Sequence, residues 1–512
     1  MALGIFLRVF LLLQDVPLWG DQAALAINIL QRNYHELLKP LDNDQVAPIG
    51  FLWIERFALT TFGSSEIAMR LFPTIAGILA LLLFAIWARS LVDPLAAVLA
   101  TGALAVSTMV LRRCVELKPY GFDLMSAIVI LLLVTRFLQT RRFRWLWRLI
   151  VLTPLLTAVS YPSLFILASA GIVLLADAWQ FRRSRWIVVL FCVIAAGSFL
   201  VIFHPVSSEQ FAASQVQMRQ YWNDSFPPAN PLQLLVWLFL AHSGSTFGYP
   251  IEGNSPASLP TFAVCVFGLI LIIRKSKRIG WLLGLPFLLT LAAAAIRRYP
   301  YGGSNGGARV MQHVAPIIIL LIGVGAAAML RAAKPNWHKP LAMGLMVLLA
   351  VIGISPILRN AFRKIPPYPL ERESRRFVQQ DLFRIGSHPT AAVLAVPRKM
   401  PFDLQWYLAR QDVPLVQSSA ESLSGDAFPG AVWVFAPRFM VDEIAESREA
   451  GAAASATVAT KDDDFVLAVQ SRLKRDAAAR WQRRDQNDPS QRWEACGFPA
   501  VRMTAPATQP AK

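Results

Sequence analysis

The chain has 512 residues, of which 55% are hydrophobic and only 16% are charged, and its formal net charge is +18. A soluble domain keeps about a quarter of its residues charged, so this composition excludes an ordinary soluble enzyme. The excess of lysine and arginine would suit nucleic acid in a soluble protein, but here it gathers in short segments between long apolar runs. The sequence therefore predicts a polytopic α-helical membrane protein.

The apolar runs predict about eleven transmembrane helices within a module of residues 1–358. The first is short and runs outward from the cytoplasm. Residues 15–65 then form a first external loop with two amphipathic stretches, and residues 204–255 form another external loop with an apolar helix near 232–240. Within 149–178 we expect two shorter helices that meet near Ser160–Ser163. The other spans are expected near 66–90, 94–112, 121–136, 186–203, 258–273, 279–296, 309–330 and 340–357.

Basic clusters between the spans predict the orientation, because lysine and arginine accumulate in cytoplasmic loops. Four clusters stand out, at 141–148, 182–185, 274–278 and 331–339. They place the N-terminus in the cytoplasm and the region after the last span outside, which suits a cell inner (plasma) membrane.

The composition becomes mixed and charged after Arg359, so residues 359–500 are predicted to form a small extracytoplasmic α/β domain. Short strands are expected at 393–396 and 432–435, and an amphipathic helix at 371–383. Residues 501–512 are predicted to be a disordered tail. The four cysteines and the histidines follow no ligand spacing, so we expect no metal site and no cofactor.

Ionisable residues at the outer ends of the spans are the first candidates for a site, because charge at membrane depth is costly and tends to mark function. Asp21 directly follows the first span, and Glu66 and Arg70 lie at the start of the second. Asp21 has an alternative explanation as the cap of a helix that begins at Gln22.

Four short motifs follow one another on the predicted outer side. They are Arg8 with Trp19–Gln22; Gln45, Ala47 and Pro48 with Arg70, Leu71, Pro73 and Gly77; Glu116, Lys118, Pro119 and Tyr120; and Tyr299, Pro300, Gly302, Gly303, Arg309 and Pro316. In this order they resemble the GT-C glycosyltransferases, in particular the protein O-mannosyltransferase-like and aminoarabinose-transferase-like branch. The resemblance runs from about residue 6 to residue 330. One departure is Gln22, where the family has a glutamate after the loop aspartate.

The resemblance implies a GT-C-like bundle that transfers a sugar from a polyprenyl-phosphate donor to a glycan, lipid or protein acceptor outside the membrane. Asp21 would be the general base. The leaving phosphate would be neutralised by cations, for which Lys118, Arg70 and Arg309 are the candidates. Glu116 would position Lys118 or bind sugar hydroxyls, and the sugar or phosphate would contact Tyr120, Tyr299 and Tyr301. Direct attack would invert the anomeric carbon.

Simpler explanations stay open for several of these residues. Lys118 and Arg309 could be interfacial cations that snorkel, and the tyrosines could belong to an aromatic belt. At the level of the whole protein, the alternatives are a transporter or flippase of a lipid-linked sugar and a non-catalytic scaffold. A transporter should show two related halves with broken helices, and the sequence has no such internal symmetry.

Overall fold

A computed structural model of the chain describes residues 1–202, 222–250, 258–302 and 307–361. In the C-terminal part it describes Arg375 and residues 392–395, 402–410, 415–418, 432–437, 482–483 and 493–498. The chain divides into two compact units. The first comprises Met1–Asp15 and Asn28–Lys364, and the second comprises Val16–Ile27 and Ile365–Lys512.

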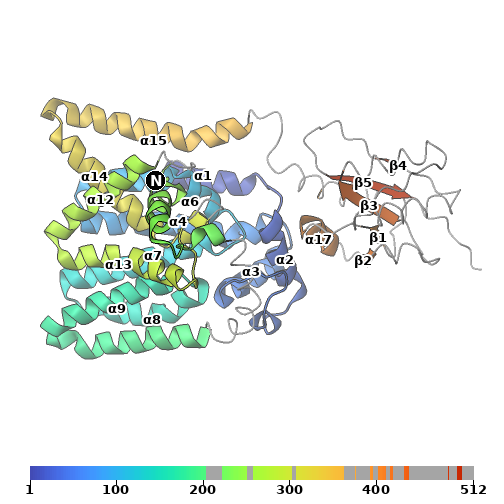
Figure 1. Cartoon of the computed structure of the whole chain (residues 1–512), viewed down its shortest axis with the longest axis horizontal. Helices are drawn as coiled ribbons and strands as arrows, with labels where there is room; N and C mark the ends of the chain where they lie inside the picture. The colour runs from blue at the N-terminus through green and yellow to red at the C-terminus, as the bar shows by residue number, and fades with distance from the viewer. Residues whose placement is uncertain are drawn as a thin grey trace, which may run out of the picture. The chain divides into compact units, whose positions relative to one another are not determined.

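The first unit is a bundle of helices, which lie side by side in Figure 1. Its α-helices are α1 (Ala2–Leu13), α3 (Ile49–Phe62), α4 (Leu71–Leu91), α5 (Pro94–Val106), α6 (Thr108–Cys114), α7 (Tyr120–Thr140), α8 (Arg144–Val159), α9 (Ser163–Gln180), α11 (Pro231–Ser243), α12 (Leu259–Lys275), α13 (Lys277–Ala295), α14 (Ala315–Ala332) and α15 (His338–Ala361). A helix α2 (Gly20–Gln31) bridges the two units in sequence. The two expected helices around Ser160–Ser163 are α8 and α9.

Among the described residues, seven helices are long and apolar enough to cross a membrane, or eight if one bent pair counts as a single span. They include a helix over Arg182–Ile202 that is mostly exposed within the chain, as a lipid-facing helix would be. The chain is therefore a membrane protein. The count of about eleven spans stays a prediction, since helices such as α1 and α11 are short.

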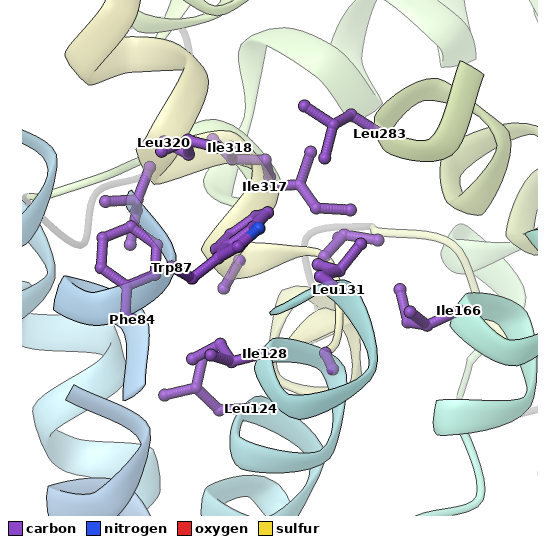
Figure 2. Close-up of a cluster of buried hydrophobic side chains, with 14 of the residues drawn as sticks. Phe84, Trp87, Leu124, Ile128, Leu131, Ile166, Leu283, Ile317, Ile318 and Leu320 are labelled. Carbon is purple, nitrogen blue, oxygen red and sulfur yellow. The ribbon is translucent and has the colours of Figure 1, made fainter. Parts of the chain in front are cut away.

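The centre of the bundle is built from α4, α7 and α14, whose apolar side chains interlock around the buried Trp87 ring (Figure 2). Glycine allows these helices to approach closely, as is common in membranes. A Cβ atom at Gly121 would lie 2.4 Å from the carbonyl oxygen of Pro73, and one at Gly77 would lie 2.6 Å from the Cβ atom of Cys114. The first approach fixes the first turns of α4 and α7 against each other, and the second fixes α4 against α6.

The expected span over 94–112 is broken, which corrects the prediction of one continuous helix. Helices α5 and α6 meet at Ser107 with a bend of 54°. The guanidinium of Arg8, which is fully buried, donates to the carbonyl oxygens of Leu104 at 3.4 Å and Ala105 at 3.3 Å. A charged donor from α1 thus satisfies carbonyls that the break leaves without helical partners. The backbone N–H of Thr108 donates to the Pro250 carbonyl at 3.0 Å.

A buried ion-pair cluster stabilises the end of the bundle opposite the first turns of α4 and α7. The carboxylate of Asp177, at the end of α9, is fully buried and is contacted by Arg141 after α7 and by Arg278 of α13, the latter at 2.8 Å. Arg141 also lies over the rings of Phe137 and Phe181. Three helices are tied together by one acid and two arginines.

The second unit contains a five-stranded sheet of order β2-β1-β3-β5-β4. Strand β1 (Ala392–Ala395) pairs in parallel with β2 (Leu415–Ser418) and β3 (Val432–Pro437), whereas β5 (Trp493–Phe498) pairs antiparallel with β3 and β4 (Gln482–Arg483). A helix α17 spans Phe402–Ala409. The extent and class of a domain over 359–500 stay predictions. The expected helix at 371–383 and the tail at 501–512 lie outside the described residues, apart from Arg375.

The Asp177 cluster makes a prediction with an adjacent control. Arg141→Gln should lower the free energy of unfolding by about 2 kcal/mol, less than the loss of a wholly buried pair because Arg278 still faces Asp177. Arg142→Gln removes the same charge from an exposed neighbour and should change stability little. Thermal unfolding of both purified variants in detergent would measure the difference, and equal melting temperatures would contradict it.

Candidate functional site

Several loops converge at the end of the bundle where α4, α7 and α9 begin. The close approach of Gly121 to Pro73 joins the segment before α7 to the segment before α4. The ring of Tyr299, from the loop after α13, lies 5.1 Å from the ring of Phe165 on α9. Burial, and then the nearby charges of Asp123 and Tyr120, raise the pKa of the Tyr299 phenol. The loops before α4 and α7 and the loop after α13 therefore meet at one end.

Lys118 and Glu116 lie in a tight turn between α6 and α7. Both are 9% exposed, and the backbone N–H of Lys118 donates to the carbonyl of Glu116 at 2.8 Å. The Lys118 ammonium donates to Oε1 of Gln45 at 2.8 Å. The Glu116 carboxylate accepts from Arg113 at 2.6 Å. Because both charges are almost removed from water, each needs such partners.

Arg70 lies at the end of the 3₁₀ helix η2 (Ala68–Arg70), directly before α4, and is 5% exposed. Glu66, four residues earlier, is 1% exposed. Thr74, in the first turn of α4, donates its hydroxyl to the Arg70 carbonyl at 2.7 Å. The two ionisable residues that the sequence places at the start of this span are therefore both buried within the protein.

Arg309 is held in the loop between α13 and α14. It lies in the 3₁₀ helix η6 (Gly307–Met311), is 9% exposed, and its guanidinium carbon lies 5.1 Å from the centre of the Trp222 ring. The loop closes tightly, since a Cβ atom at Gly307 would lie 1.4 Å from the Gly302 carbonyl oxygen, and Gly302 has a φ of +65°. Glycine is therefore required at these turns, and the chain path brings Arg309 beneath Trp222.

The three candidate tyrosines are largely committed to contacts within the protein. Tyr299 donates its hydroxyl to the Val310 carbonyl at 2.7 Å. His242 must donate from Nδ1 to the Leu238 carbonyl, so its Nε2 accepts from the hydroxyl of Tyr301 at 3.0 Å. Tyr120 begins α7 and is 7% exposed. These contacts hold the three rings within the protein, and their role toward a ligand stays a prediction.

Asp21 lies in the first turn of α2 and is half-buried. Its segment, Val16–Ile27, groups with the second compact unit, whereas the other seven candidates lie in the first. A carboxylate in the first turn of a helix is stabilised by the helix dipole, and it can also be a functional group. The position of Asp21 therefore agrees with both explanations, a helix-terminal acid and a catalytic base. Its role as a base stays a prediction.

Two further polar residues at this end were not singled out from the sequence. Asp123 is the fourth residue of α7 and lies beside Ser160, and its Oδ1 atom is buried without a hydrogen-bond partner in the described part of the chain. Gln312 is 1% exposed, and its amide nitrogen and oxygen are likewise buried without a hydrogen-bond partner among the residues that the structure describes. An acid inside an apolar span is a sequence signal that could have identified Asp123. No comparable signal marks Gln312.

Three cations, Arg70, Lys118 and Arg309, are thus brought to one end of the bundle and nearly buried there. Cations withdrawn from water interact more strongly with an anion than surface cations do. Such an arrangement is suited to an anionic group, and the neighbouring acids and amide could accept or donate hydrogen bonds to a polar ligand.

Comparisons with known proteins agree with this geometry. Residues 46–208 match the family described as dolichyl-phosphate-mannose-protein mannosyltransferase. The crystal structure of ArnT from Cupriavidus metallidurans bound to undecaprenyl phosphate superposes with a TM-score of 0.50 at 14% identity, covering 96% of this chain and 97% of that one. The chain is thus similar to this mannosyltransferase family over residues 46–208, and it shares the GT-C fold of ArnT. The family resemblance expected from the motifs is therefore confirmed.

Other solved structures have lower similarity to this GT-C chain. ArnT from Cupriavidus metallidurans in the apo state gives a TM-score of 0.49 at 13% identity, covering 85% of this chain and 91% of that one. The oligosaccharyltransferase AglB from Archaeoglobus fulgidus, in complex with an inhibitory peptide and a dolichol-phosphate, gives 0.46 at 12% identity, covering 87% and 70%. No curated protein matches the sequence.

A buried histidine in the loop before α14, His313, makes a prediction about pH. His313 is fully buried between Thr290 and Phe165, and burial lowers its pKa from 6.5 to about 3. The unfolded chain binds a proton at this residue below pH 6.5 and the folded chain does not. As the pH decreases below 6.5, the free energy of unfolding should therefore fall by about 1.4 kcal/mol per pH unit. At pH 5 the loss should be roughly 2 kcal/mol.

His313→Gln, which can still bond to Thr290, should lose this part of the acid sensitivity. The measurement is the melting temperature of the wild type and the variant between pH 7.5 and 5. His35→Gln, which removes an exposed histidine, is the control and should follow the wild type. Parallel curves for wild type and His313→Gln would contradict the prediction.

Proposed function

We propose that the chain transfers a sugar from a polyprenyl-phosphate donor to an acceptor on the extracytoplasmic side of a cell inner membrane. The observation that carries this proposal is the burial of Arg70, Lys118 and Arg309 at one end of a membrane bundle. The match of residues 46–208 to the mannosyltransferase family supports it, and so does the undecaprenyl phosphate bound in the ArnT structure of the same fold.

The cations suit the leaving group of this reaction. A polyprenyl-phosphate sugar is a phosphodiester with one negative charge, and departure of the sugar leaves a phosphate that gains a second. Fixed cations that meet this growing charge lower the barrier, because they interact more strongly with the transition state than with the bound donor. The lipid tail would lie in the bilayer while its phosphate reached Lys118, Arg70 and Arg309.

We assign the general base to Asp21. The acceptor hydroxyl must lose a proton as its oxygen attacks the anomeric carbon, and a carboxylate within hydrogen-bond reach can take it. Attack by the acceptor on the face opposite the departing phosphate is a single displacement and inverts the anomeric configuration. Glu116, Tyr120 and Tyr299 are assigned to the walls that contact the donor.

The distribution of basic residues also supports an orientation with the candidate site outside the membrane. The four basic clusters lie at the end of the bundle that contains Arg141 and Arg278, opposite the end with Lys118 and Tyr299. Lysine and arginine favour the cytoplasmic side. We therefore assign the candidate site and the region after Arg359 to the outside.

Replacement of Asp21 tests the base assignment. Asp21→Asn should reduce transfer by about a factor of 10² to 10⁴, the usual range for loss of a general base, with folding and membrane insertion unchanged. The assay uses purified protein with a panel of radiolabelled polyprenyl-phosphate sugars. Glu36→Gln, in the same external loop, should transfer like the wild type.

The panel also separates the enzyme from its alternative. Transfer or donor hydrolysis by the wild type would identify the sugar. If the wild type turned over no donor but moved labelled lipid across a vesicle membrane, the transporter explanation would replace this proposal. Near-normal turnover by Asp21→Asn would remove the base assignment alone.

Lys118→Ala tests the phosphate site. Loss of a buried, charged donor should weaken the affinity for undecaprenyl phosphate by about 10- to 100-fold, since hydrogen bonds to charged groups contribute about 1.5–3 kcal/mol. Lys39→Ala removes an exposed lysine of the first external loop and should bind normally. Titration of both variants with the lipid in detergent measures the effect, and unchanged affinity would remove Lys118 from the site.

A further inference from the structure

Gln45 is a side chain of the first external loop that contacts Lys118 of the candidate phosphate site. Its Oε1 atom accepts from the Lys118 ammonium at 2.8 Å, and its Nε2 atom donates to the Asn43 carbonyl at 3.1 Å. Because a carbonyl can only accept, the second bond fixes which way the amide faces. The amide oxygen is therefore directed at Lys118, and it reaches across 73 residues of sequence.

The backbone before Gln45 has an unfavourable conformation. Asn43 has a φ of 59° and Asp44 a φ of 54°, both in the left-handed region. Each such residue costs about 1 kcal/mol or more, although asparagine and aspartate tolerate it best. Two in succession persist only where the flanking structure holds them, so the position of Gln45 depends on what fixes the loop on either side.

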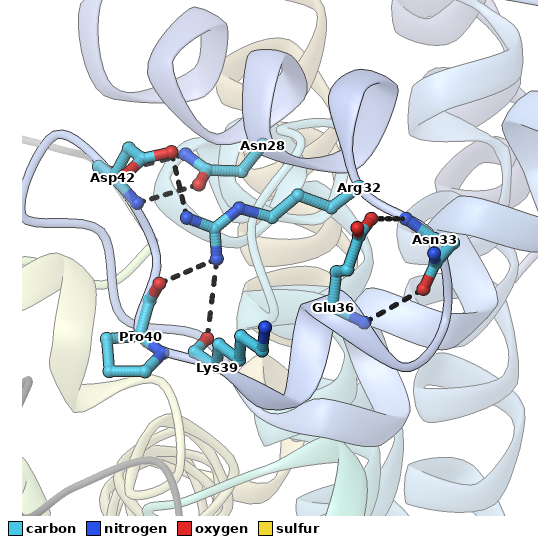
Figure 3. A network of polar contacts seen from close by, with 7 residues as sticks. All are labelled: Asn28, Arg32, Asn33, Glu36, Lys39, Pro40 and Asp42. Atoms are coloured by element: carbon cyan, nitrogen blue, oxygen red, sulfur yellow. Dashed lines mark hydrogen bonds and ion pairs between the residues drawn. The ribbon is translucent and has the colours of Figure 1, made fainter.

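The upstream side is anchored at Asp42 by the end of α2 and the residue after it (Figure 3). The backbone N–H of Asp42 donates to Asn28 Oδ1 at 2.7 Å, and Asn28 Nδ2 donates to the Asp42 carbonyl at 3.1 Å. Arg32 donates to the Asp42 carboxylate at 2.8 Å and to the Pro40 carbonyl at 2.6 Å. Asp42 is thus held through its backbone and its side chain.

The downstream side is anchored as well. The hydroxyl of Tyr161, in the break between α8 and α9, donates to the Ala47 carbonyl at 3.1 Å. Pro48 and Ile49 then begin α3, and a Cβ atom at Gly50 would lie 2.8 Å from the Ala158 carbonyl oxygen. Residues 42 to 47 are therefore a short bridge fixed at both ends, and its Gln45 contacts Lys118.

We propose that Gln45 is a positioning residue that holds the Lys118 ammonium toward the leaving phosphate, with Asn28 and Arg32 as its anchor. A glutamine suits this role for an electrostatic reason. A neutral amide oxygen satisfies one of the three N–H groups of the ammonium without cancelling its charge, whereas a carboxylate would compete with the phosphate for it. The inference rests on the proposed role of Lys118.

A double-mutant cycle tests the proposal, with undecaprenyl phosphate as the probe and full-length protein in detergent. Gln45→Ala should weaken lipid binding about tenfold, the effect of losing one hydrogen bond to a charged group. In a Lys118→Ala background the same substitution should have no further effect, because its action passes through the ammonium. An equal loss in both backgrounds would overturn the proposal, as would normal binding by Gln45→Ala.

Gln45→Glu guards against a purely structural effect, since it preserves the size of the side chain. If Gln45 only fills space, this variant should bind like the wild type, and that result would overturn the proposal. If the neutral acceptor matters, the carboxylate should pair with Lys118 and weaken binding more than Gln45→Ala does. Melting temperatures of all variants would show that each is folded.

The anchor has its own matched pair of variants. Arg32→Ala should weaken lipid binding by about three- to tenfold, because it frees Asp42 and the bridge. Asn33→Ala disrupts only the adjacent exposed turn, where Asn33 accepts from Glu36 at 2.9 Å, and should leave binding unchanged. If Lys118→Ala itself bound normally, the proposed phosphate site would fail. If only the Gln45 and Arg32 variants bound normally, the positioning role alone would fail.

Discussion

The requirement that every backbone polar group and charge in a membrane find a partner within the protein governs this structure. Regular helices meet it by themselves, and a break must meet it by other means. At Ser107 the guanidinium of Arg8 and the carbonyl of Pro250 supply the partners. At the break between α8 and α9, the hydroxyl of Ser163 donates to the Ser160 carbonyl. The irregular segments are therefore as tightly specified as the helices they interrupt.

This requirement also explains why the candidate site lies where the helices end. Buried cations such as Lys118 and Arg309 need partners with irregular geometry, and the loops before α3 and α11 supply them through Gln45 and Trp222. A continuous helix satisfies its own backbone and offers few free acceptors to a neighbour. The candidate binding groups and the helix interruptions consequently occur together at one end, an arrangement also found in transporters that bind polar ligands at membrane depth.

Much of the bundle could be predicted from hydropathy, because long apolar runs have one structural outcome in lipid. The pair α8 and α9 followed from Pro162 and the flanking basic clusters. The break at Ser107 could not be predicted, because no proline or glycine marks it and its partner Arg8 lies on a different helix. Similarly, the placement of Lys118 at a span end was visible in the sequence, whereas its contact with Gln45 depends on a fold that brings two external loops together. Asp123, the fourth residue of α7, was not predicted because the motifs that indicate the site lie in the loops and not within the span.

The Asp177 cluster has a consequence for biogenesis. As the chain is synthesised, α7 and α9 enter the membrane early, and Arg278 follows Asp177 by about a hundred residues. Until α13 arrives, Arg141 is the only one of the two arginines that can neutralise the buried carboxylate. Helix α13 is thus matched to its position by charge as well as by shape. When it inserts, Arg278 completes the ion-pair cluster that Arg141 and Asp177 have already formed.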